Sequence, residues 1–254
     1  MGDRISGFRQ KLRQGDRLTG TFVKTPAHEI VEVLARTGLD FLCLDAEHAP
    51  FDRARLDACL AVSCALDMPT LVRIPESSPS RILTTLDAGA TGIVVPHVDS
   101  AAKAQAIAKA ARFGAGGRGF AGSTRWAGFA TRSMSEVLKQ TEETAVIAQI
   151  EEPAGVDAAS AIAATDGVDA LFIGPADLSV AYGHETLDNP DLDAAFGTVR
   201  TVCREQNKGF MTWVPSAGAA AAWRKHGLTA FVVGSEHAWI AAGARGAAQD
   251  VWAD

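Results

Sequence analysis

Two carboxylates, Glu151 and Asp177, each lie just beyond a short apolar run of the chain. The runs, Ala145–Ile150 and Ala170–Gly174, are rich in apolar residues and end in polar turns, as buried parallel strands do. Parallel strands joined by a helix end at the same edge of their sheet, so we expect the two acids to face one opening. Two hard oxygen ligands suit Mg²⁺ or Mn²⁺ when substrate and water complete the coordination shell. The sequence therefore predicts a metal-dependent enzyme.

Each of the two acids also has a structural explanation. Negative side chains are favourable in the first turn of a helix, so Glu151 could be a solvated first-turn residue. Asp177 could serve the helix expected over Ala176–Tyr182, and at this position both roles could coexist. The neighbouring Glu152 is expected behind the metal ligands or at the surface. The occurrence of acids at two consecutive strand ends favours the metal site for the pair.

A histidine, His48, follows another acid-rich strand end, Asp45-Ala-Glu47. A histidine oriented by a carboxylate is the usual form of a general base because its pKa lies near neutrality. The structural alternative is a loop histidine that caps the turn before Pro50.

An arginine, Arg73, closes the next expected strand. Its planar fork suits a carboxylate or an enolate oxygen. A salt bridge to Asp45 or Asp87 is the structural alternative, and one arginine could serve both purposes. Asp87 itself lies at the end of a helical segment rather than after a strand, so its position alone predicts a structural role.

Lys24 offers a metal-free alternative because it closes the first expected strand. A desolvated lysine could form a Schiff base and support aldol chemistry without a metal ion. Little apolar sequence surrounds Lys24 beyond the strand, and Thr25-Pro26 predict an exposed turn. The metal site is favoured over this alternative.

Other candidate motifs are better explained by structural roles. Gly114–Gly119 spells G-x-G-x-x-G, but it follows a helical segment rather than a strand and so does not fit a dinucleotide fingerprint. His97, His184 and His237 are candidate metal ligands without His-x-x-His spacing, and we expect them at core or turn positions. The 4 cysteines also lack metal-ligand spacing and are expected to be reduced thiols in the core.

Strand-like and helix-like segments alternate along all 254 residues, which predicts a single-domain (β/α)8 barrel over 1–254, with a doubly wound sheet as the runner-up. The polar candidates follow the strands rather than precede them, as the C-terminal mouth of a barrel requires. The expected strands are Thr19–Val23, Phe41–Leu44, Thr70–Arg73, Gly92–Val95, Val146–Ile150, Ala170–Ile173, Phe210–Val214 and Ala230–Val233. The expected helices include Ala27–Thr37, Arg53–Leu66, Ser100–Phe113, Ala154–Ala164, Leu192–Gln206, Ala217–His226 and Ser235–Gln249.

Two segments fall outside this alternation. Gly114–Met134 is rich in glycine and arginine, and we expect it to form an ordered loop over the mouth. The tail, Ala241–Asp254, is expected either to pack on a neighbouring subunit or to be an ordinary last helix.

Composition excludes several classes of partner. A net charge of −6 without a basic tract argues against nucleic acid. We expect no signal peptide and no membrane partner, because no window approaches the roughly 18 apolar residues of a membrane span. A cytoplasmic location follows as the default expectation.

Six segments, in the same order along the chain, resemble the HpcH/HpaI family of metal-dependent pyruvate aldolases. Within that family the chain is similar to 4-hydroxy-2-oxoheptanedioate and 2-dehydro-3-deoxyglucarate aldolases. The resemblance implies a (β/α)8 barrel and a homo-oligomer, commonly a hexamer in which the C-terminal helix is exchanged between subunits. The matching segments are Phe41–Asp52, Leu71–Pro75, Leu86–Val98, Gly116–Trp126, Ala148–Gly155 and Phe172–Ser179.

Carried over residue by residue, the resemblance implies Glu151 and Asp177 as ligands of Mg²⁺ or Mn²⁺, with Co²⁺ or Zn²⁺ as alternatives. It implies His48 as the catalytic base, assisted by an acid. Asp45 and Asp87 both match acidic positions of the family, so the resemblance implies that Asp87, like Asp45, is a candidate for the acid that assists His48.

The remaining correspondences concern the substrate. Arg73 is similar to the residue that binds the carbonyl or enolate oxygen, and Gln149 and the Ala176 backbone match positions that line the pyruvate site. The segment Phe120–Arg132 varies in the family together with the acceptor aldehyde. Sugar-derived 2-keto-3-deoxy acids and dicarboxylic 4-hydroxy-2-oxo acids both remain candidate substrates.

The implied reaction is reversible retro-aldol cleavage of a 4-hydroxy-2-oxo acid to pyruvate and an aldehyde. The alternative is a carbon–carbon lyase of the citrate-lyase β-subunit or malyl-CoA type, for which Arg112–Arg132 is the only candidate groove for a CoA arm. A non-enzymatic metabolite-binding or assembly subunit is disfavoured, because it would have no need of a base and metal ligands together.

Overall fold

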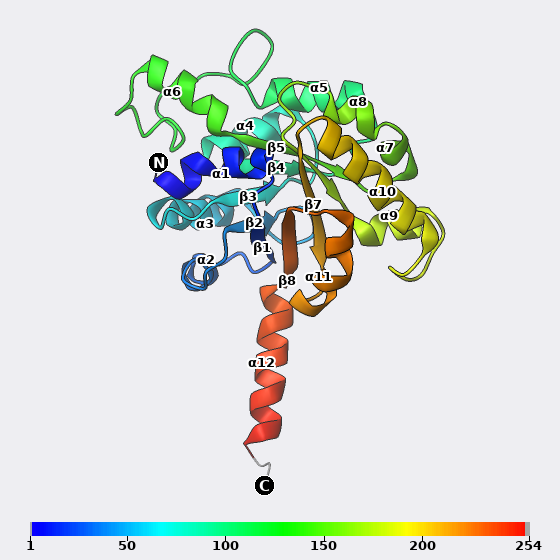
Figure 1. The fold of residues 1–254 in the computed structure, drawn as a ribbon. Helices are drawn as coiled ribbons and strands as arrows, with labels where there is room; N and C mark the ends of the chain where they lie inside the picture. The colour runs from blue at the N-terminus through cyan, green and yellow to red at the C-terminus, as the bar shows by residue number, and fades with distance from the viewer. Residues whose placement is uncertain (1, 252–254) are drawn as a thin grey trace.

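The computed structural model describes residues 2–251 and shows a closed barrel of eight parallel strands in sequential order (Figure 1). Both the (β/α)8 architecture and the strand positions predicted from the sequence are confirmed. Within the described residues no helix is long and apolar enough to cross a membrane. The strands are β1 (Leu18–Val23), β2 (Phe41–Asp45), β3 (Thr70–Arg73), β4 (Gly92–Val95), β5 (Ala145–Ile150), β6 (Ala170–Ile173), β7 (Gly209–Val214) and β8 (Ala230–Ser235).

Helices surround the barrel and cover its outer face (Figure 1). Several begin at a side-chain cap that the sequence supplies, such as Ser100 before α5 and Asp52 before α3. The helices are α1 (Asp3–Gln14), α2 (His28–Leu34), α3 (Arg53–Ala65), α4 (Pro79–Asp87), α5 (Ala101–Ala110), α6 (Met134–Gln140), α7 (Pro153–Asp157), α8 (Ala159–Ala163), α9 (Pro175–Ala181), α10 (Pro190–Glu205), α11 (Ala217–Trp223) and α12 (Glu236–Asp250), with short 3₁₀ turns at Thr141–Glu143 and Arg224–His226.

The strand side chains form two cores. One set points outward and packs under the helices, and the other fills the barrel, with Phe22, Phe41 and Phe172 among its members. Alternation between two buried faces explains why the strands read as continuous apolar runs.

The helix α1 closes the N-terminal end of the barrel, and the sequence analysis did not predict it. Ile5, Phe8 and Leu12 are buried along one face, and the ring of Phe8 lies 5.5 Å from that of Phe41. The barrel interior is therefore sealed at this end, which leaves the opposite, C-terminal end as the mouth.

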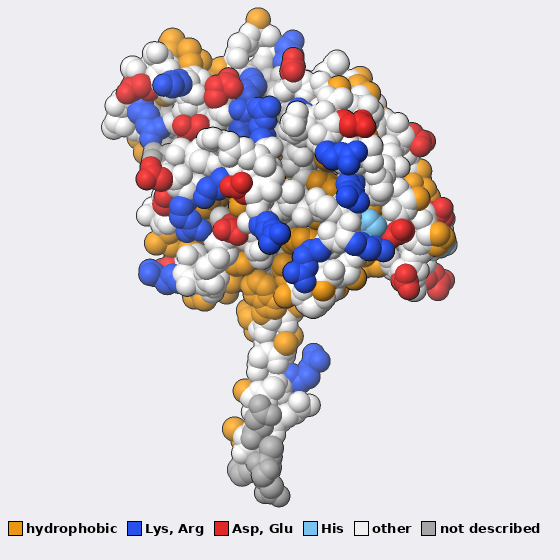
Figure 2. Space-filling model, viewed as in Figure 1, with side chains coloured by type: hydrophobic (Ala, Val, Ile, Leu, Met, Phe, Trp, Pro, Cys, Tyr) orange, Lys and Arg blue, Asp and Glu red, His pale blue; other side chains and the backbone are white. Residues whose placement is uncertain are grey.

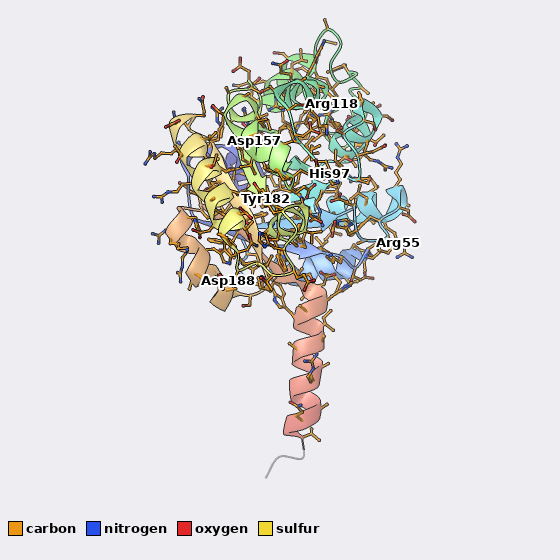
Figure 3. The ribbon with its side chains drawn as sticks, turned by 90° about the vertical axis from the view of Figure 1, so that its right-hand side faces the viewer. Arg55, His97, Arg118, Asp157, Tyr182 and Asp188 are labelled. Atoms are coloured by element: carbon orange, nitrogen blue, oxygen red, sulfur yellow. The ribbon has the colours of Figure 1, made fainter. Side chains whose placement is uncertain are left out.

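The segment 114–134 does not cover the mouth, so that expectation was wrong. It leaves the end of α5 and leads into α6, and its Trp126 N–H donates to the carbonyl of Asp87 at the end of α4. A connection from a helix to the next strand lies at the N-terminal face of a barrel, because helices run antiparallel to the strands. Figure 3 labels Arg118 farther from α12 than His97.

The last helix, α12, extends away from the barrel (Figure 1). Its first residue, Glu236, is buried and accepts hydrogen bonds from the backbone N–H groups of Lys24 and Thr25, which ties the helix to the end of β1. Beyond this turn its side chains are largely exposed, and hydrophobic atoms gather around its root (Figure 2). Residues 252–254 of the predicted tail lie outside the described residues.

Candidate active site

Two neighbouring strand ends at the mouth carry an arginine and an aspartate that bind each other. Asp45 and Arg73 are register partners at the ends of β2 and β3. The Nε and Nη2 groups of Arg73 donate to the two carboxylate oxygens of Asp45 at 3.0 and 2.8 Å. The Lys24 ammonium lies 3.2 Å from the same carboxylate. Asp45 is fully buried, so this fixed pair forms the floor of one side of the mouth.

The charges of this pair stabilise each other. Burial alone would raise the pKa of Asp45, but the hydrogen bonds and charge of Arg73, together with the His48 N–H and Lys24, hold that pKa below its ordinary value. Burial opposes the charge of Arg73 as well, yet Asp45 keeps the pKa of the guanidinium raised. The Arg73 guanidinium also lies 4.4 Å from the centre of the Phe22 ring. Asp45 is therefore an ionised anchor rather than a proton carrier.

The carboxylate beside the histidine base candidate is Glu47 rather than Asp45. Glu47 Oε2 lies 3.7 Å from His48 Nε2 and 3.2 Å from Arg73 Nε, whereas Asp45 reaches His48 only through the backbone N–H. Burial raises the pKa of Glu47 against the opposing charges of Arg73 and His48, and the carboxylates of Glu151 and Asp45 raise it further. Its Oε2 atom is buried without a hydrogen-bond partner among the described residues.

Glu151 lies just beyond β5, is only 3% exposed and is held from two sides. The backbone N–H of His97 donates to its Oε1 at 2.7 Å, and the side-chain amide of Gln149 donates to its Oε2. A Cβ added to Gly174 would lie 3.0 Å from Oε2, so glycine at residue 174 lets the β6–α9 turn approach this closely without displacing the carboxylate. The predicted ligand is therefore a positioned, nearly water-free carboxylate.

One more side chain, His97, completes a cluster with metal-binding capacity. Its Nδ1 lies 3.2 Å from Glu151 Oε1, and its Nε2 lies 3.9 Å from Glu47 Oε1. One ligand atom from each of Glu47, His97 and Glu151 lies within 4.8 Å of the others. Two carboxylates and an imidazole form a donor set that fits a divalent cation.

Asp177 lies in the first turn of α9, where it is exposed. The first-turn position that the sequence predicted as its structural role is thus confirmed, and its metal role stays a prediction. Asp177 lines a cavity of about 400 Å³ at the mouth. The same cavity is lined by Lys24, His48, Arg73, Gln149, Ala176 and Trp213.

This cavity collects most of the predicted site residues. His48, Arg73, Gln149, Ala176 and Asp177 line it, and Asp45 and Glu151 accept hydrogen bonds from two of the lining residues, Arg73 and Gln149. A larger cavity of about 870 Å³ lies at the opposite face, beside α1 and α5, but it contains none of these predicted residues. The chemistry that the residues can support is concentrated at the mouth.

Asp87 is the predicted site residue that does not join the cluster. It ends α4 at the N-terminal face, where its carboxylate accepts from the Arg118 guanidinium at 2.5 Å. The side chain of Arg118 is fully buried, so this pair anchors the segment 114–134. Within this chain Asp87 has the structural role that its position predicted, and its assistance to His48 stays a prediction.

Glu47 and His97 are the two members of the cluster that sequence reasoning did not select. A usable signal existed for each: Glu47 lies in the same strand-end loop as Asp45 and His48, and His97 follows β4 at the mouth. Their contacts depend on local backbone geometry, which strand order alone does not give.

The amino-acid sequence is similar to those of known proteins over most of its length. The model of the HpcH/HpaI aldolase/citrate lyase family matches residues 18–241. The chain is 31% identical to a hydroxypyruvate/pyruvate aldolase of Paraburkholderia phytofirmans, with 96% of each chain covered. It is 37% identical to a 4-hydroxy-2-oxovalerate aldolase of Novosphingobium aromaticivorans, over 76% of this chain and 72% of that one.

The fold has a similar match among solved structures. A crystal structure of an HpcH/HpaI aldolase/citrate lyase family protein from Burkholderia cenocepacia superposes with a TM-score of 0.92 at 32% identity. The match covers 98% of this chain and 100% of that chain. Both comparisons therefore extend over the barrel and its mouth.

Proposed function

Because the chain belongs to the HpcH/HpaI aldolase/citrate lyase family, and is thus an aldolase-type carbon–carbon lyase, we propose that it cleaves 4-hydroxy-2-oxo acids reversibly to pyruvate and an aldehyde with a divalent metal ion. The observation that carries the proposal is the shared cavity at the mouth, which joins Arg73, His48 and Gln149. The family assignment confirms the resemblance that the six sequence segments indicated.

Glu151 and Asp177 are the proposed metal ligands, with Glu47 close enough to Glu151 to contribute. The ion, when bound, supplies Lewis-acid polarisation of the 2-oxo group of the substrate. Mg²⁺ and Mn²⁺ suit the two carboxylates that the sequence indicated, and Co²⁺ and Zn²⁺ are the alternatives.

Arg73 stabilises negative charge on the substrate oxygen. Its Nε and Nη2 donors are used by Asp45, which leaves the Nη1 donors for the carbonyl oxygen that becomes an enolate oxygen as the C3–C4 bond breaks. The bidentate grip of Asp45 fixes the guanidinium before substrate arrives, so little reorganisation is needed during the reaction.

His48 removes the proton of the C4 hydroxyl in the cleavage direction and returns a proton in the synthetic direction. The imidazole is largely exposed, lines the cavity and lies 3.7 Å from Glu47, whose carboxylate can orient the ring. Gln149 and the backbone of Ala176 line the same cavity and bind the pyruvate carboxylate end.

The substrate class follows from the relatives and from the size of the mouth. The relatives act, by their names, on hydroxypyruvate with pyruvate and on 4-hydroxy-2-oxovalerate. A cavity of about 400 Å³ suits small acids of this kind.

A second copy of the chain completes the assembly in this proposal. An isolated helix of 12–15 residues is marginal in water, so α12 needs a partner surface to remain helical. The exposed Trp239 and Ile240 provide apolar contacts for such a partner. We therefore propose a hexamer in which the C-terminal helix is exchanged between subunits. The mass of the purified protein in solution tests the number of subunits.

The CoA-ester alternative gains no support from the arginines that it requires. Arg118 and Arg125 pair with Asp87 and Asp57, and Arg112 donates to the Thr144 carbonyl. Arg118 and Arg125 anchor the segment 114–134 to the barrel, and none of the three arginines lines the cavity at the mouth.

The proposed function is tested by incubating the purified protein with 4-hydroxy-2-oxo acids and measuring pyruvate with lactate dehydrogenase. The substrates tested are 4-hydroxy-2-oxovalerate, a 2-keto-3-deoxy sugar acid and 4-hydroxy-2-oxoheptanedioate. Malyl-CoA is tested separately as the substrate of the alternative enzyme. Release of pyruvate from at least one free acid supports the aldolase. Cleavage of malyl-CoA alone, detected as release of acetyl-CoA and glyoxylate, would overturn the proposal in favour of a CoA-ester lyase.

A further inference from the structure

A histidine in an uncommon backbone conformation lies against the metal-binding carboxylates. His97 follows β4 with a φ of 54°, in the left-handed region that side-chain-bearing residues seldom adopt. Both of its backbone groups are held: the N–H donates to Glu151 Oε1 at 2.7 Å, and the carbonyl accepts from Lys103 Nζ at 2.5 Å. Strained residues held in this way cluster at functional sites.

This backbone conformation places the imidazole among three carboxylates. Nδ1 lies 3.2 Å from Glu151 and 3.0 Å from Glu152, and Nε2 lies 3.9 Å from Glu47. The ring remains 56% exposed, so it borders solvent rather than the core. The expectation of a core or turn histidine therefore describes its turn but not the carboxylates around it.

From these contacts we propose that His97 is a nitrogen ligand of the metal site and makes the site favour a borderline ion such as Co²⁺ or Zn²⁺ over Mg²⁺. The proposal rests on the metal site of the proposed function and adds to the two acids that the sequence indicated. Imidazole suits borderline transition ions, whereas Mg²⁺ prefers oxygen ligands and keeps several of its waters. An imidazole beside two carboxylates thus changes which ion binds best.

The alternative is that a protonated His97 serves only as a counter-charge for Glu151 and Glu152. The two explanations differ in what happens when the imidazole is removed. Loss of a ligand weakens Co²⁺ binding far more than Mg²⁺ binding. Loss of a counter-charge leaves the carboxylates more negative, so it strengthens the binding of both ions to a similar degree.

The test compares metal affinities of the full-length protein after the metal has been stripped and replaced. Co²⁺ and Mg²⁺ dissociation constants are measured by competition with a fluorescent chelator for wild type and for His97→Asn, since asparagine tolerates the left-handed backbone and lacks the imidazole. His184→Asn is the matched control, because His184 forms a histidine–carboxylate pair with Asp191 at 2.7 Å outside the site cluster.

We expect His97→Asn to weaken Co²⁺ binding by about tenfold or more while Mg²⁺ binding changes by less than about threefold. The control should leave both affinities unchanged. Equal changes for the two ions, or stronger binding of both, would overturn the proposal.

A second measurement does not depend on any variant. Pulsed electron paramagnetic resonance of Mn²⁺-loaded wild-type protein should show coupling to an imidazole ¹⁴N nucleus, and its absence would overturn the proposal. The outcome is separable from that of the proposed function. Selective Co²⁺ binding through His97 without pyruvate release would reject the aldolase alone, and metal-dependent pyruvate release without nitrogen ligation would reject the role of His97 alone.

Discussion

The guanidinium of Arg73 grips both carboxylate oxygens of Asp45, at 3.0 and 2.8 Å, across the joined ends of β3 and β2. The pair is buried, and it presents the remaining donors of Arg73 at the mouth of the barrel. This one interaction therefore stabilises the barrel and also positions the proposed catalytic group Arg73. The effect on stability and the effect on activity can be tested separately.

Replacing Asp45 by asparagine should destabilise the protein, because the buried Arg73 guanidinium loses the negative charge that accepts two of its hydrogen bonds. The expected loss in the free energy of unfolding at pH 7 is about 3–5 kcal/mol, measured by urea denaturation. Asp193→Asn is the control, since Asp193 pairs with Lys225 at the surface and such pairs contribute little. Equal effects of the two substitutions would contradict the assignment of Asp45 as a buried anchor.

The same aspartate should contribute to acid sensitivity. Its pKa is lower in the folded chain than in the unfolded chain, so its ionised form favours folding. This contribution is complete above the ordinary pKa of 3.8 and is lost as the pH falls through the lower, folded pKa. We expect the free energy of unfolding of wild type to fall more steeply below about pH 4 than that of Asp45→Asn. Parallel curves for the two proteins would contradict the shift.

Removing the proposed base should slow the reaction without removing the metal. His48→Ala is expected to lower kcat by about 10²–10⁴-fold, the usual contribution of a general base. Metal affinity should change little because the closest contacts of the proposed ligand Glu151 are His97 and Gln149. Unchanged turnover in the variant would remove His48 from the mechanism.

A methyl group at Gly174 should disturb Glu151 selectively. The added Cβ would lie 3.0 Å from Glu151 Oε2 and 3.2 Å from Gln149 Nε2, so both side chains would have to move. We expect Gly174→Ala to weaken metal binding by about tenfold or more, measured by calorimetry. Gly197→Ala, where the added Cβ meets nothing within 4 Å, is the control and should bind metal like wild type.

The Schiff-base alternative makes its own prediction. Lys24 lines the mouth and pairs with Asp45, so it lies within reach of a substrate. Borohydride added with pyruvate should leave activity and mass unchanged if the reaction depends on metal rather than on this amine. Inactivation with a mass increase at Lys24 would transfer the chemistry to the lysine.

The barrel was predictable because its strands are buried on both faces. The expected strands at Thr70–Arg73, Gly92–Val95 and Ala170–Ile173 agree fully with the observed bounds, since a proline follows each run within two residues and cannot donate to a strand ladder. The helix α1 was missed although Ile5, Phe8 and Leu12 follow a helical period, because a single short amphipathic segment before the first strand is not part of the barrel repeat. The segment 114–134 was placed at the wrong face because its composition was weighed above its position after a helix.

The candidate site was predictable to the extent that it follows from strand ends. The rule that parallel strands end at one edge placed Asp45, Arg73 and Glu151 together, as the structure does. It could not place His97, whose left-handed backbone is held by Glu151, a residue 54 positions away in the chain. Nor could it tell that Glu47, rather than Asp45, lies beside the His48 ring.

The central claim, a metal-dependent pyruvate aldolase at the mouth of the barrel, is tested most directly by pyruvate release before and after EDTA and again after a divalent ion is restored. The account predicts that chelation abolishes the activity of the wild type and that added metal restores it. In Glu151→Gln, added metal should not restore activity. Pyruvate release that is indifferent to EDTA would contradict it.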